Sequence, residues 1–409
     1  MEPWLTARGG NMGRTSNRMS GFIVILCLGL LFALPSFKSA ESAEPIILGA
    51  AVSLTGNLAR SGLDQKLGYE LWKESVNTRG GILGRKVDLR IYDDRSEPMT
   101  GAKLYEKLIT SDKVDLLVGP YGSGVTAAVS TAVEKHKMVM IAPGASSKEI
   151  WERGYKYVFQ MITPARYQLT SSVEIAKTNG YKTFVVINAD SAFPRDLAKG
   201  ALEDIKSANL KLLFHEEYPE KANDLSSLVL KIKAAAPDVL IAGSYLPDSV
   251  LLIRQAKAAN LTPQMIQFGP VGPSIPDFAK SLGDLSSHLL GVSQWEPAVK
   301  YAGSPEMVSA FKKKFPNEEA DYSVAAAYSS CEVMRMAVEK TGGLDQEKLR
   351  QAILSMDVMT PFGRFKVGPS GDQLGHLTVL VQVLNGERMV VWPAEAAVRK
   401  IVLPFPGWK

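Results

Sequence analysis

Short apolar runs of strand length alternate with amphipathic segments of helix length along most of this chain. The series starts with the apolar run Ile46–Ala51 and continues with a helical pattern over residues 63–77. It then returns to a strand in which Val87, Leu89 and Ile91 alternate with polar residues. Strands that alternate with helices of roughly ten to fifteen residues form βαβ units, which build parallel sheets. The alternation therefore predicts an α/β protein.

The alternation occurs in two series, and the second begins at the strand Thr183–Asn188. Further helices are predicted over residues 99–109, 124–135, 194–208, 223–235 and 248–259, and further strands over residues 114–118, 138–142, 211–216, 239–243 and 265–268. A chain of this length can form two domains of ordinary size, each with its own core. Two such series therefore predict two similar lobes.

The alternation stops after residue 300. Three helices are predicted in succession, over residues 304–315, 323–340 and 346–355. Two β-rich runs then flank the pair Asn385-Gly386, and an Asn-Gly pair between two such runs indicates a β-hairpin. The last part of the chain is therefore predicted to add helices and a hairpin to the two βαβ series.

The first 43 residues have the layout of a secretory signal peptide. Three arginines precede the apolar run Phe22–Leu34, which is too short to span a membrane comfortably. Small residues follow it, and cleavage is predicted after Ser42 or after Ala43. An uncleaved N-terminal anchor is the alternative interpretation. We expect residues 1–43 to be a signal peptide and the rest of the chain to be exported.

Charge and cysteine content argue against a nucleic-acid partner and against an intramolecular disulfide. Because the predicted signal peptide carries four basic and two acidic residues, the formal net charge of +5 falls to +3 in the exported chain. Acidic and basic residues are interspersed, so no nucleic-acid partner is predicted. Cys27 lies in the signal peptide, which leaves Cys331 alone and makes an intramolecular disulfide impossible.

No signature of catalysis or of cofactor binding stands out in the sequence. The turn after the first strand, AAVSLTGN, lacks the glycine pattern of a dinucleotide site, and GILGRK is not a phosphate-binding loop. The stretch around Ser123 does not have the spacing of a nucleophile elbow. The four histidines have no metal-ligand spacing. The sequence therefore predicts neither an enzyme nor a bound metal or cofactor.

Two strand-to-helix turns have the same chemistry. VGPYGSG places Ser123 at the start of a helix, and IAPGASSKE places Ser146 and Ser147 at the start of another, where Ser146 and Glu149 fit a capping box. Helix N-termini offer free backbone N–H groups and a partial positive charge, beyond the carboxyl ends of the strands. The two turns together suit a carboxylate ligand, with ordinary helix N-caps at both places as the alternative.

Several longer stretches follow one another in a recognisable order. They are ILGAAVSLTGNLARSG, NTRGGILGRKVDLRIYDD, VGPYGS with IAPGASS, INADSAFPRDLA, AGSYLPDSVLLIRQAK, DYSVAAAYSSCEVM and TPFGRFKVGPSGDQ. In this order the chain resembles the periplasmic binding proteins of branched-chain amino-acid ABC transporters, the Leu/Ile/Val-binding type, over nearly all of its exported part. The resemblance implies the type I periplasmic-binding-protein fold, with two doubly wound parallel-sheet lobes joined by a three-crossing hinge. Lobe one would take residues 44–164 and 295–372, and lobe two residues 165–294 and 373–409.

The resemblance also implies a ligand site between the lobes. The family's carboxylate-binding serine falls on Ser123, a second hydroxyl contact falls on Ser146, and aromatic contacts of the second lobe fall on Phe193 and Tyr245. The full predicted set is Tyr121, Ser123, Gly144, Ser146, Ser147, Phe193, Tyr245, Val271 and Tyr322, with Ser323 as the alternative to Tyr322. No metal ligand belongs to this set.

Val271 departs from the family's pattern. Relatives that bind amino acids carry a glutamate at this place, which pairs with the ammonium group of the ligand. A buried ammonium loses hydration worth several kcal/mol and needs a carboxylate or several acceptors in return. We therefore favour a carboxylate without a free α-amino group, such as an aromatic or branched organic acid, over leucine or valine. Asp190, in a turn of the second lobe, is the alternative partner for an ammonium group, or else a cap of the helix that starts near Pro194.

The function that the resemblance implies is capture of a small solute in the periplasm for an ABC importer. The partners would be the solute and a permease in the inner membrane, and a monomer is the default for this family. A ligand sensor of the same fold is the alternative function. Such a sensor would respond to an amide, urea or an organic acid and report to a regulator.

Overall fold

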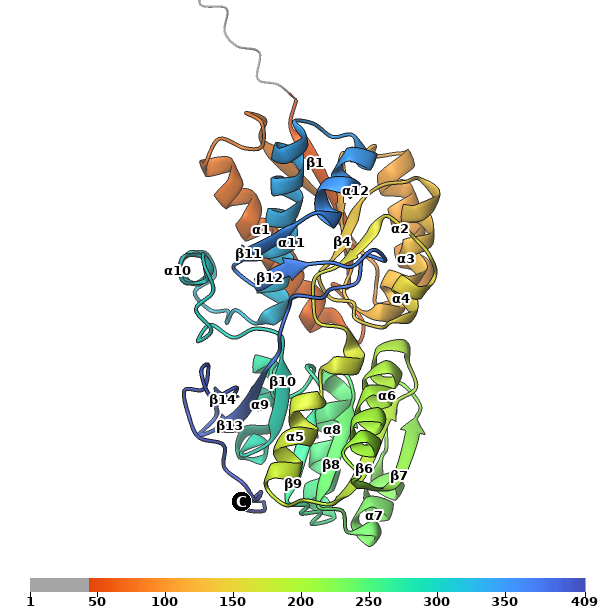
Figure 1. Cartoon of the computed structure of the whole chain (residues 1–409), viewed down its shortest axis with the longest axis vertical. Coiled ribbons are helices and arrows are strands. Elements are labelled where there is room, and N and C mark those ends of the chain that lie inside the picture. The colour runs from red at the N-terminus through yellow and green to blue at the C-terminus, as the bar shows by residue number, and fades with distance from the viewer. Residues whose placement is uncertain (1–43, 409) are drawn as a thin grey trace, which may run out of the picture. The chain divides into compact units, whose positions relative to one another are not determined.

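The strands of the computed structural model form two large sheets and one small sheet, each large sheet with helices packed against it (Figure 1). The structure describes residues 44–408. The predicted signal peptide and its cleavage site lie outside the described residues. None of the helices between residues 44 and 408 is long and apolar enough to cross a bilayer.

The first large sheet has five parallel strands in the order β2-β1-β3-β4-β5. They are β1 (Ile46–Val52), β2 (Val87–Asp93), β3 (Leu116–Val118), β4 (Met140–Ala142) and β5 (Val158–Gln160). The chain leaves β1 for β2 and then returns past β1 to β3, so the strand order reverses between β1 and β3. Right-handed crossovers place the helix after β1 on one face and the helices after β2 and β3 on the other.

Helices from two distant parts of the chain cover this first sheet. They are α1 (Ala59–Thr78), α2 (Pro98–Thr110), α3 (Ser123–Lys135), α4 (Glu149–Glu152), α10 (Ser304–Lys314), α11 (Tyr322–Thr341) and α12 (Gln346–Leu354). Figure 1 shows α1 beside α11, and α2 beside α3. Trp72 on α1 is buried in the core. The small sheet is the antiparallel hairpin of β11 (Asp357–Thr360) and β12 (Gly363–Lys366).

The second large sheet has seven strands in the order β14-β13-β10-β9-β8-β6-β7. They are β6 (Thr183–Ala189), β7 (Lys211–Tyr218), β8 (Val239–Gly243), β9 (Met265–Phe268), β10 (Leu290–Ser293), β13 (Val379–Leu384) and β14 (Glu387–Trp392). The first five are parallel, and β13 and β14 add an antiparallel edge.

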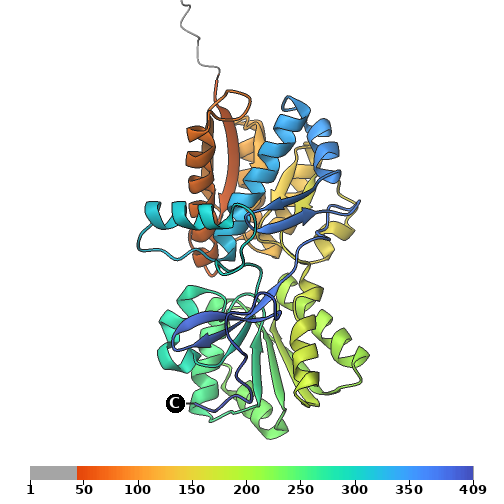
Figure 2. The same cartoon turned by 60° about the vertical axis from the view of Figure 1, so that its left-hand side comes forward.

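The second sheet lies between two groups of helices (Figure 2). These helices are α5 (Thr170–Thr178), α6 (Ala192–Ser207), α7 (Ser226–Ala235), α8 (Leu246–Ala258) and α9 (Pro276–Leu282). Two 3-10 turns complete this lobe, η1 (Ala165–Tyr167) and η2 (Gly283–Ser286). Right-handed crossovers put α6 on one face and α7, α8 and α9 on the other, and α5 packs beside α6.

The chain passes between the two lobes three times: after β5, after β10, and between β12 and β13. Buried amide side chains tie these three connections together. Oε1 of Gln294 accepts a hydrogen bond from the amide of Thr163 (3.1 Å), and its carbonyl is 2.7 Å from Nε2 of His376. Nε2 of Gln373 donates to the carbonyl of Met161 (3.0 Å). Burial lowers the pKa of His376 to about 4, so the connections meet without an ionised histidine near neutral pH.

The predicted α/β fold of two doubly wound lobes is confirmed, and so is the hairpin, whose turn residues Asn385 and Gly386 have φ values of +53° and +79°. The sequence patterns do not predict α5, α9, β5 or β10, which are short or lie close to the connections. The residue boundaries assigned to the two lobes stay a prediction.

Gly200 lies on α6 where η1, the turn of the first connection, packs against that helix. A β-carbon at this position would lie 2.0 Å from the carbonyl oxygen of Arg166. Gly200→Ala should therefore lower the free energy of unfolding by about 1–3 kcal/mol. Steric overlap outweighs the gain of about 1 kcal/mol that alanine otherwise brings to a helix interior.

Gly124→Ala on α3 is the matched control, because no atom lies within 4 Å of an added β-carbon there. This variant should be as stable as the parent or slightly more stable. Chemical denaturation followed by circular dichroism measures both variants. Equal stability of the two alanine variants would contradict the close packing of η1 on α6.

Candidate ligand-binding site

The carboxyl ends of five parallel strands supply the walls of one cavity. Residues that follow β3 and β4 line it from the first lobe, and residues that follow β6, β8 and β9 line it from the second. In open α/β sheets, ligands bind outside the carboxyl ends of the strands, at the point where the strand order reverses. That point lies between β1 and β3 in one sheet and between β6 and β8 in the other. Both lobes therefore present their favoured binding position to the same cavity.

Two buried tyrosines fix the chain where it leaves β3. The hydroxyl of Tyr105 donates to the carbonyl of Val118 (2.5 Å), and the hydroxyl of Tyr69 donates to the carbonyl of Gly119 (2.9 Å). The chain then turns at Gly122, whose φ of +90° is a conformation that other residues rarely adopt. This turn brings Ser123 and the N-terminus of α3 into the cavity wall.

Ser123 joins the two loops of the first lobe. Its Oγ accepts hydrogen bonds from the backbone amides of Ser146 and Ser147, both at 3.1 Å. Gly122 is the N-cap of α3 and no side chain caps this helix, so the N-cap interpretation of Ser123 is wrong. A serine hydroxyl has two acceptor lone pairs and one proton. Because both lone pairs of Ser123 are used, its proton remains available to an acceptor.

The loop after β4 differs from the prediction. Ser146 and Ser147 precede a helix of only four residues, α4, whose N-cap is Lys148 and which has no side-chain cap. The predicted capping box of Ser146 with Glu149 is therefore wrong. Of the two turns, only the one after β3 brings a helix of ordinary length, α3, to the cavity. The first N–H groups of such a helix have no acceptor within the helix and favour an anion.

Gly144 leaves room for an aromatic side chain. A β-carbon at this position would lie 2.6 Å from Cδ2 of Tyr121 and 2.6 Å from Nε2 of Gln65. Tyr121 fills this space, and its hydroxyl is 2.6 Å from the hydroxyl of Tyr322 at the start of α11. Burial raises the pKa of Tyr121 to about 12 and raises the pKa of Tyr322 well above its usual value. Both phenols are therefore neutral near pH 7, and because one hydroxyl donates to the other, the pair has at most one proton left for a ligand.

The wall from the second lobe is aromatic and aliphatic. Phe193 at the start of α6 and Tyr245 just before α8 lie with their ring centroids 5.9 Å apart. Val271 is buried, and its carbonyl accepts a hydrogen bond from the hydroxyl of Ser249 (2.8 Å). Burial raises the pKa of Tyr245 well above its usual value, so this wall carries no ionised group near pH 7.

The structure brings eight of the nine predicted site residues together. The lining consists of Tyr121, Gly122, Ser123, Gly144, Ser146, Ile162, Phe193, Tyr245, Pro270, Val271 and Tyr322. Ser147 is the exception, since its amide binds Ser123 and its hydroxyl is 3.4 Å from the carbonyl of Ala192. Ser323, the alternative to Tyr322, also lies outside the lining. Of the three residues that were missed, two adjoin predicted turns, whereas Ile162 lies in the first connection, which no motif marks.

The polar groups of the lining are hydroxyls and backbone amides, and none of the lining side chains is charged. Two serines, three neutral tyrosines and the N-terminus of α3 offer hydrogen-bond donors, an arrangement that suits an anionic or strongly accepting group. Within residues 44–408, no group of three or more histidine, cysteine or acidic side chains is arranged to hold a metal ion.

Carboxylates lie near the cavity but do not line it. Asp190, the alternative partner for an ammonium group, is about half exposed and forms an ion pair with Arg195. Asp248, in the first turn of α8, is buried; burial and the nearby Glu220 raise its pKa to about 6. Asp321 caps α11 by accepting from an amide at its start, and burial raises the pKa of this carboxyl. Asp248 is thus better placed than Asp190 to pair with an ammonium group, because Asp190 is held at the surface.

The cavity is nearly closed. Its volume is about 10 Å³, which is room for about one water molecule. Polar contacts outside the lining also join the two lobes: Nδ2 of Asn57 donates to Oε1 of Glu220 (3.1 Å), and the amide of Lys148 donates to Oδ2 of Asp196 (2.9 Å). A ligand can therefore enter only when the walls from the two lobes separate.

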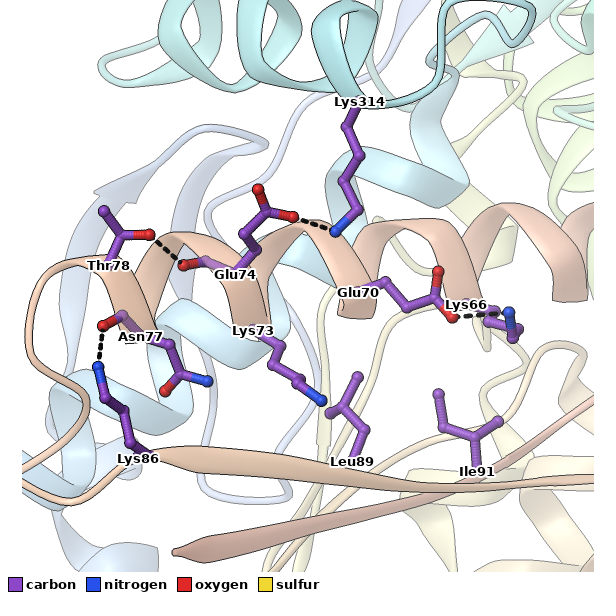
Figure 3. Close-up of a pocket in the computed structure, with 10 residues that line it drawn as sticks. All are labelled: Lys66, Glu70, Lys73, Glu74, Asn77, Thr78, Lys86, Leu89, Ile91 and Lys314. Atoms are coloured by element: carbon purple, nitrogen blue, oxygen red, sulfur yellow. Dashed lines mark hydrogen bonds and ion pairs between the residues drawn. The ribbon is translucent and has the colours of Figure 1, made fainter. Parts of the chain in front are cut away.

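A wider groove of about 810 Å³ lies between α1, β2 and Lys314 of α10 (Figure 3). Its four lysines are all paired, Lys66 with Glu70, Lys73 with Asp88, Lys86 with the carbonyl of Asn77, and Lys314 with Glu74. The three ion pairs, between partly exposed groups, contribute about 0–1 kcal/mol each and neutralise three of the four cations, while Lys86 donates to a backbone carbonyl. The enclosed cavity is therefore the better candidate for the binding site.

The chain matches the family model described as periplasmic binding protein over residues 45–388. It belongs to the periplasmic binding protein family. The leucine-, isoleucine-, valine-, threonine- and alanine-binding protein of Pseudomonas aeruginosa is 28% identical to this periplasmic binding protein over 346 residues, which are 83% of this chain and 90% of that relative. The expected resemblance to Leu/Ile/Val-binding proteins is thereby confirmed.

Solved structures share the fold of this periplasmic binding protein. LivJ of Streptococcus pneumoniae, in complex with isoleucine, matches it with a TM-score of 0.77 and 22% identity, over 88% of this chain and 100% of that one. A solute-binding protein of an ABC transporter from R. palustris, in complex with benzoate, matches with a TM-score of 0.77 and 19% identity, over 86% and 96% of the two chains. The type I fold expected from the sequence is thereby confirmed.

Ser123→Ala should lower the free energy of unfolding by about 2 kcal/mol without any ligand. The substitution leaves the buried amides of Ser146 and Ser147 without their acceptor, and an unpaired buried donor costs about 1–3 kcal/mol. Ser146→Ala is the control and should change stability by less than about 0.5 kcal/mol. Thermal and chemical denaturation compare the two variants. Equal stabilities would mean that the Ser123 hydroxyl is not needed to hold the two loops together.

Proposed function

We propose that this periplasmic binding protein captures a small organic acid with an apolar or aromatic body and without a free α-amino group. It would then deliver this acid to the permease of an ABC importer, with no chemical step. The observation that carries the proposal is the composition of the cavity lining, which has five hydroxyl groups and no carboxylate.

The carboxylate of the ligand would be bound at the first lobe. The proton of Ser123 is available because its lone pairs are occupied by two amides, and the hydroxyl of Ser146 lies in the same wall. The N-terminus of α3 adds amide groups and a partial positive charge. Hydrogen bonds to a charged group contribute roughly 1.5–3 kcal/mol each, so two hydroxyls together can account for a large part of the binding free energy.

An ammonium group would lack a partner in this lining. Val271 occupies the wall after β9, and Asp190 is bound to Arg195 outside the lining. Moving an ammonium from water into a site without a carboxylate costs several kcal/mol. Phe193, Tyr245 and Val271 provide instead an apolar surface for a ring or a branched chain.

The solved relatives make both ligand classes plausible for the fold. One of the similar structures is a complex with isoleucine and another is a complex with benzoate. The neutral lining of the cavity in this chain supports organic acids without an amino group, the class to which benzoate belongs.

Binding would close the two lobes around the ligand as rigid bodies, with bending at the three connections. The near-closed cavity and the contacts of Asn57 with Glu220 and of Lys148 with Asp196 support this motion, because these contacts must break for a ligand to enter. We further propose that the chain is exported to the periplasm through its N-terminal segment and acts there as a monomer.

The double substitution Ser123→Ala with Ser146→Ala should weaken binding of 3-phenylpropionate at least about a hundredfold, since it removes two charge-assisted hydrogen bonds. Ser147→Ala is the control, because its hydroxyl points to Ala192 and not into the lining, and it should change affinity less than about threefold. Isothermal titration calorimetry measures both. Unchanged affinity in the double variant would rule out the two serines as the carboxylate site.

Deaminated acids should bind at least about tenfold more tightly than the matching amino acids, a difference of about 1.4 kcal/mol. Calorimetry with 3-phenylpropionate against phenylalanine, and with 4-methylpentanoate against leucine, measures the difference directly. Tighter binding of the amino acids would contradict the proposed ligand class. In that event Asp248→Asn would be the next variant, and a loss of amino-acid binding would identify Asp248 as the ammonium partner.

A further inference from the structure

A further concave surface lies at the connections between the lobes, and we call it the hinge groove. It is lined by Thr163, Pro164, Tyr167, Thr170, Ser171, Glu174, Gln373, Leu374, His376, Leu377, Thr378, Trp392, Pro393 and Glu395. Its volume of about 530 Å³ lies in the range of sites that bind small molecules. Its walls come from the first and third connections, the start of α5 and the end of β14.

The floor of the hinge groove exposes apolar side chains. Tyr167, Leu374 and Leu377 have 57%, 59% and 75% of their surface exposed, which places them among the few large apolar residues left in solvent in the described part of the chain. Trp392 lies half-buried beside them. A cluster of exposed apolar side chains in a concavity marks a binding surface rather than ordinary scatter.

The charge of the hinge groove has one sign. Glu174 and Glu395 are exposed, and no lysine or arginine lies within ion-pair distance of either in the described chain. The nearest lining cation would be His376, but burial lowers its pKa to about 4 and keeps it neutral. Arg166 does not belong to the lining: its guanidinium lies over the ring of Tyr167, 5.0 Å from the centroid, and pairs with Glu203. Ser171 is also buried in this wall, and its hydroxyl has no hydrogen-bond partner in residues 44–408.

The hinge groove is distinct from the ligand cavity, although the two are neighbours along the chain. Ile162 lines the cavity, whereas the next two residues, Thr163 and Pro164, line the hinge groove. The cavity presents hydrogen-bond donors and no carboxylate, and the hinge groove presents carboxylates and no cation. The linings of the two sites therefore differ in charge.

We propose that the hinge groove is a second binding site, which takes a small organic cation with an aromatic or branched apolar body, such as an arylalkylammonium ion. The apolar body would rest on Tyr167, Leu374 and Leu377, and the ammonium group would lie between Glu174 and Glu395. This site does not depend on which solute the cavity binds.

The test titrates 2-phenylethylammonium into the exported chain, followed by calorimetry and by NMR. We expect saturable binding of one molecule per chain with a dissociation constant of about 1 mM or tighter. 2-Phenylethanol, which lacks the charge, and ethylammonium, which lacks the ring, should each bind at least about fivefold more weakly. Equal binding of either analogue, or no saturable binding of the probe, would overturn the proposal.

Variants separate the hinge groove from the cavity. Glu174→Gln with Glu395→Gln should weaken binding of the probe at least about fivefold. Glu306→Gln with Asp284→Asn is the matched control, because it removes two exposed negative charges elsewhere, and it should change binding less than about twofold. Ser123→Ala with Ser146→Ala should leave probe binding intact. Loss of probe binding in that serine variant, with retention in the glutamate variant, would place the probe in the cavity and overturn the proposal.

Discussion

Parallel strands end on the same side of a sheet, and the candidate binding site of this protein depends on that constraint. Each lobe has its strand-order reversal next to the cavity, so the loops after β3, β4, β6, β8 and β9 all reach it. None of these loops needs to be long, because the sheet has already carried the chain to the site. The rigid strands thus fix the positions of Ser123 and Tyr245, and the residue types in the loops determine which chemical groups line the cavity.

The fold could be predicted because hydrophobic periodicity records which residues face a core. The run Ile46–Ala51 is apolar throughout because β1 is buried on both faces between α1 and α2. Strand β5, Val158–Gln160, ends in a polar residue and leads directly into the first connection, so its sequence shows no bounded apolar run like those of β3 and β4. Helix α5 follows the first connection directly, and its apolar positions reflect packing against α6 that no local pattern reveals. Hydrophobic periodicity therefore predicts most helices and strands, but it does not predict the connections between the lobes.

The site could be predicted to the extent that turn motifs fix its residues. Gly122 and Ser123 belong to a strand-to-helix turn, and such a turn can be recognised from the sequence. The role of Ser123 as an acceptor could not be predicted, because its hydroxyl binds amides more than twenty residues away, in the loop after β4. The pairing of Asp190 with Arg195 could not be predicted for the same reason, since it depends on how the side chains fold back at the start of α6. Contacts between loops require the tertiary structure.

The first connection is a short, stiff link. Its upstream end is fixed to the first lobe, because the amide of Met161 donates to the carbonyl of Ala142 (3.1 Å). Its downstream end is fixed to the second lobe, where the backbone of Arg166 packs on Gly200. Pro164 has its φ locked by its ring, and the residue before a proline is confined to extended conformations. Only a handful of backbone torsions in this link remain free to rotate, so we expect it to restrict the directions in which the two lobes can move apart.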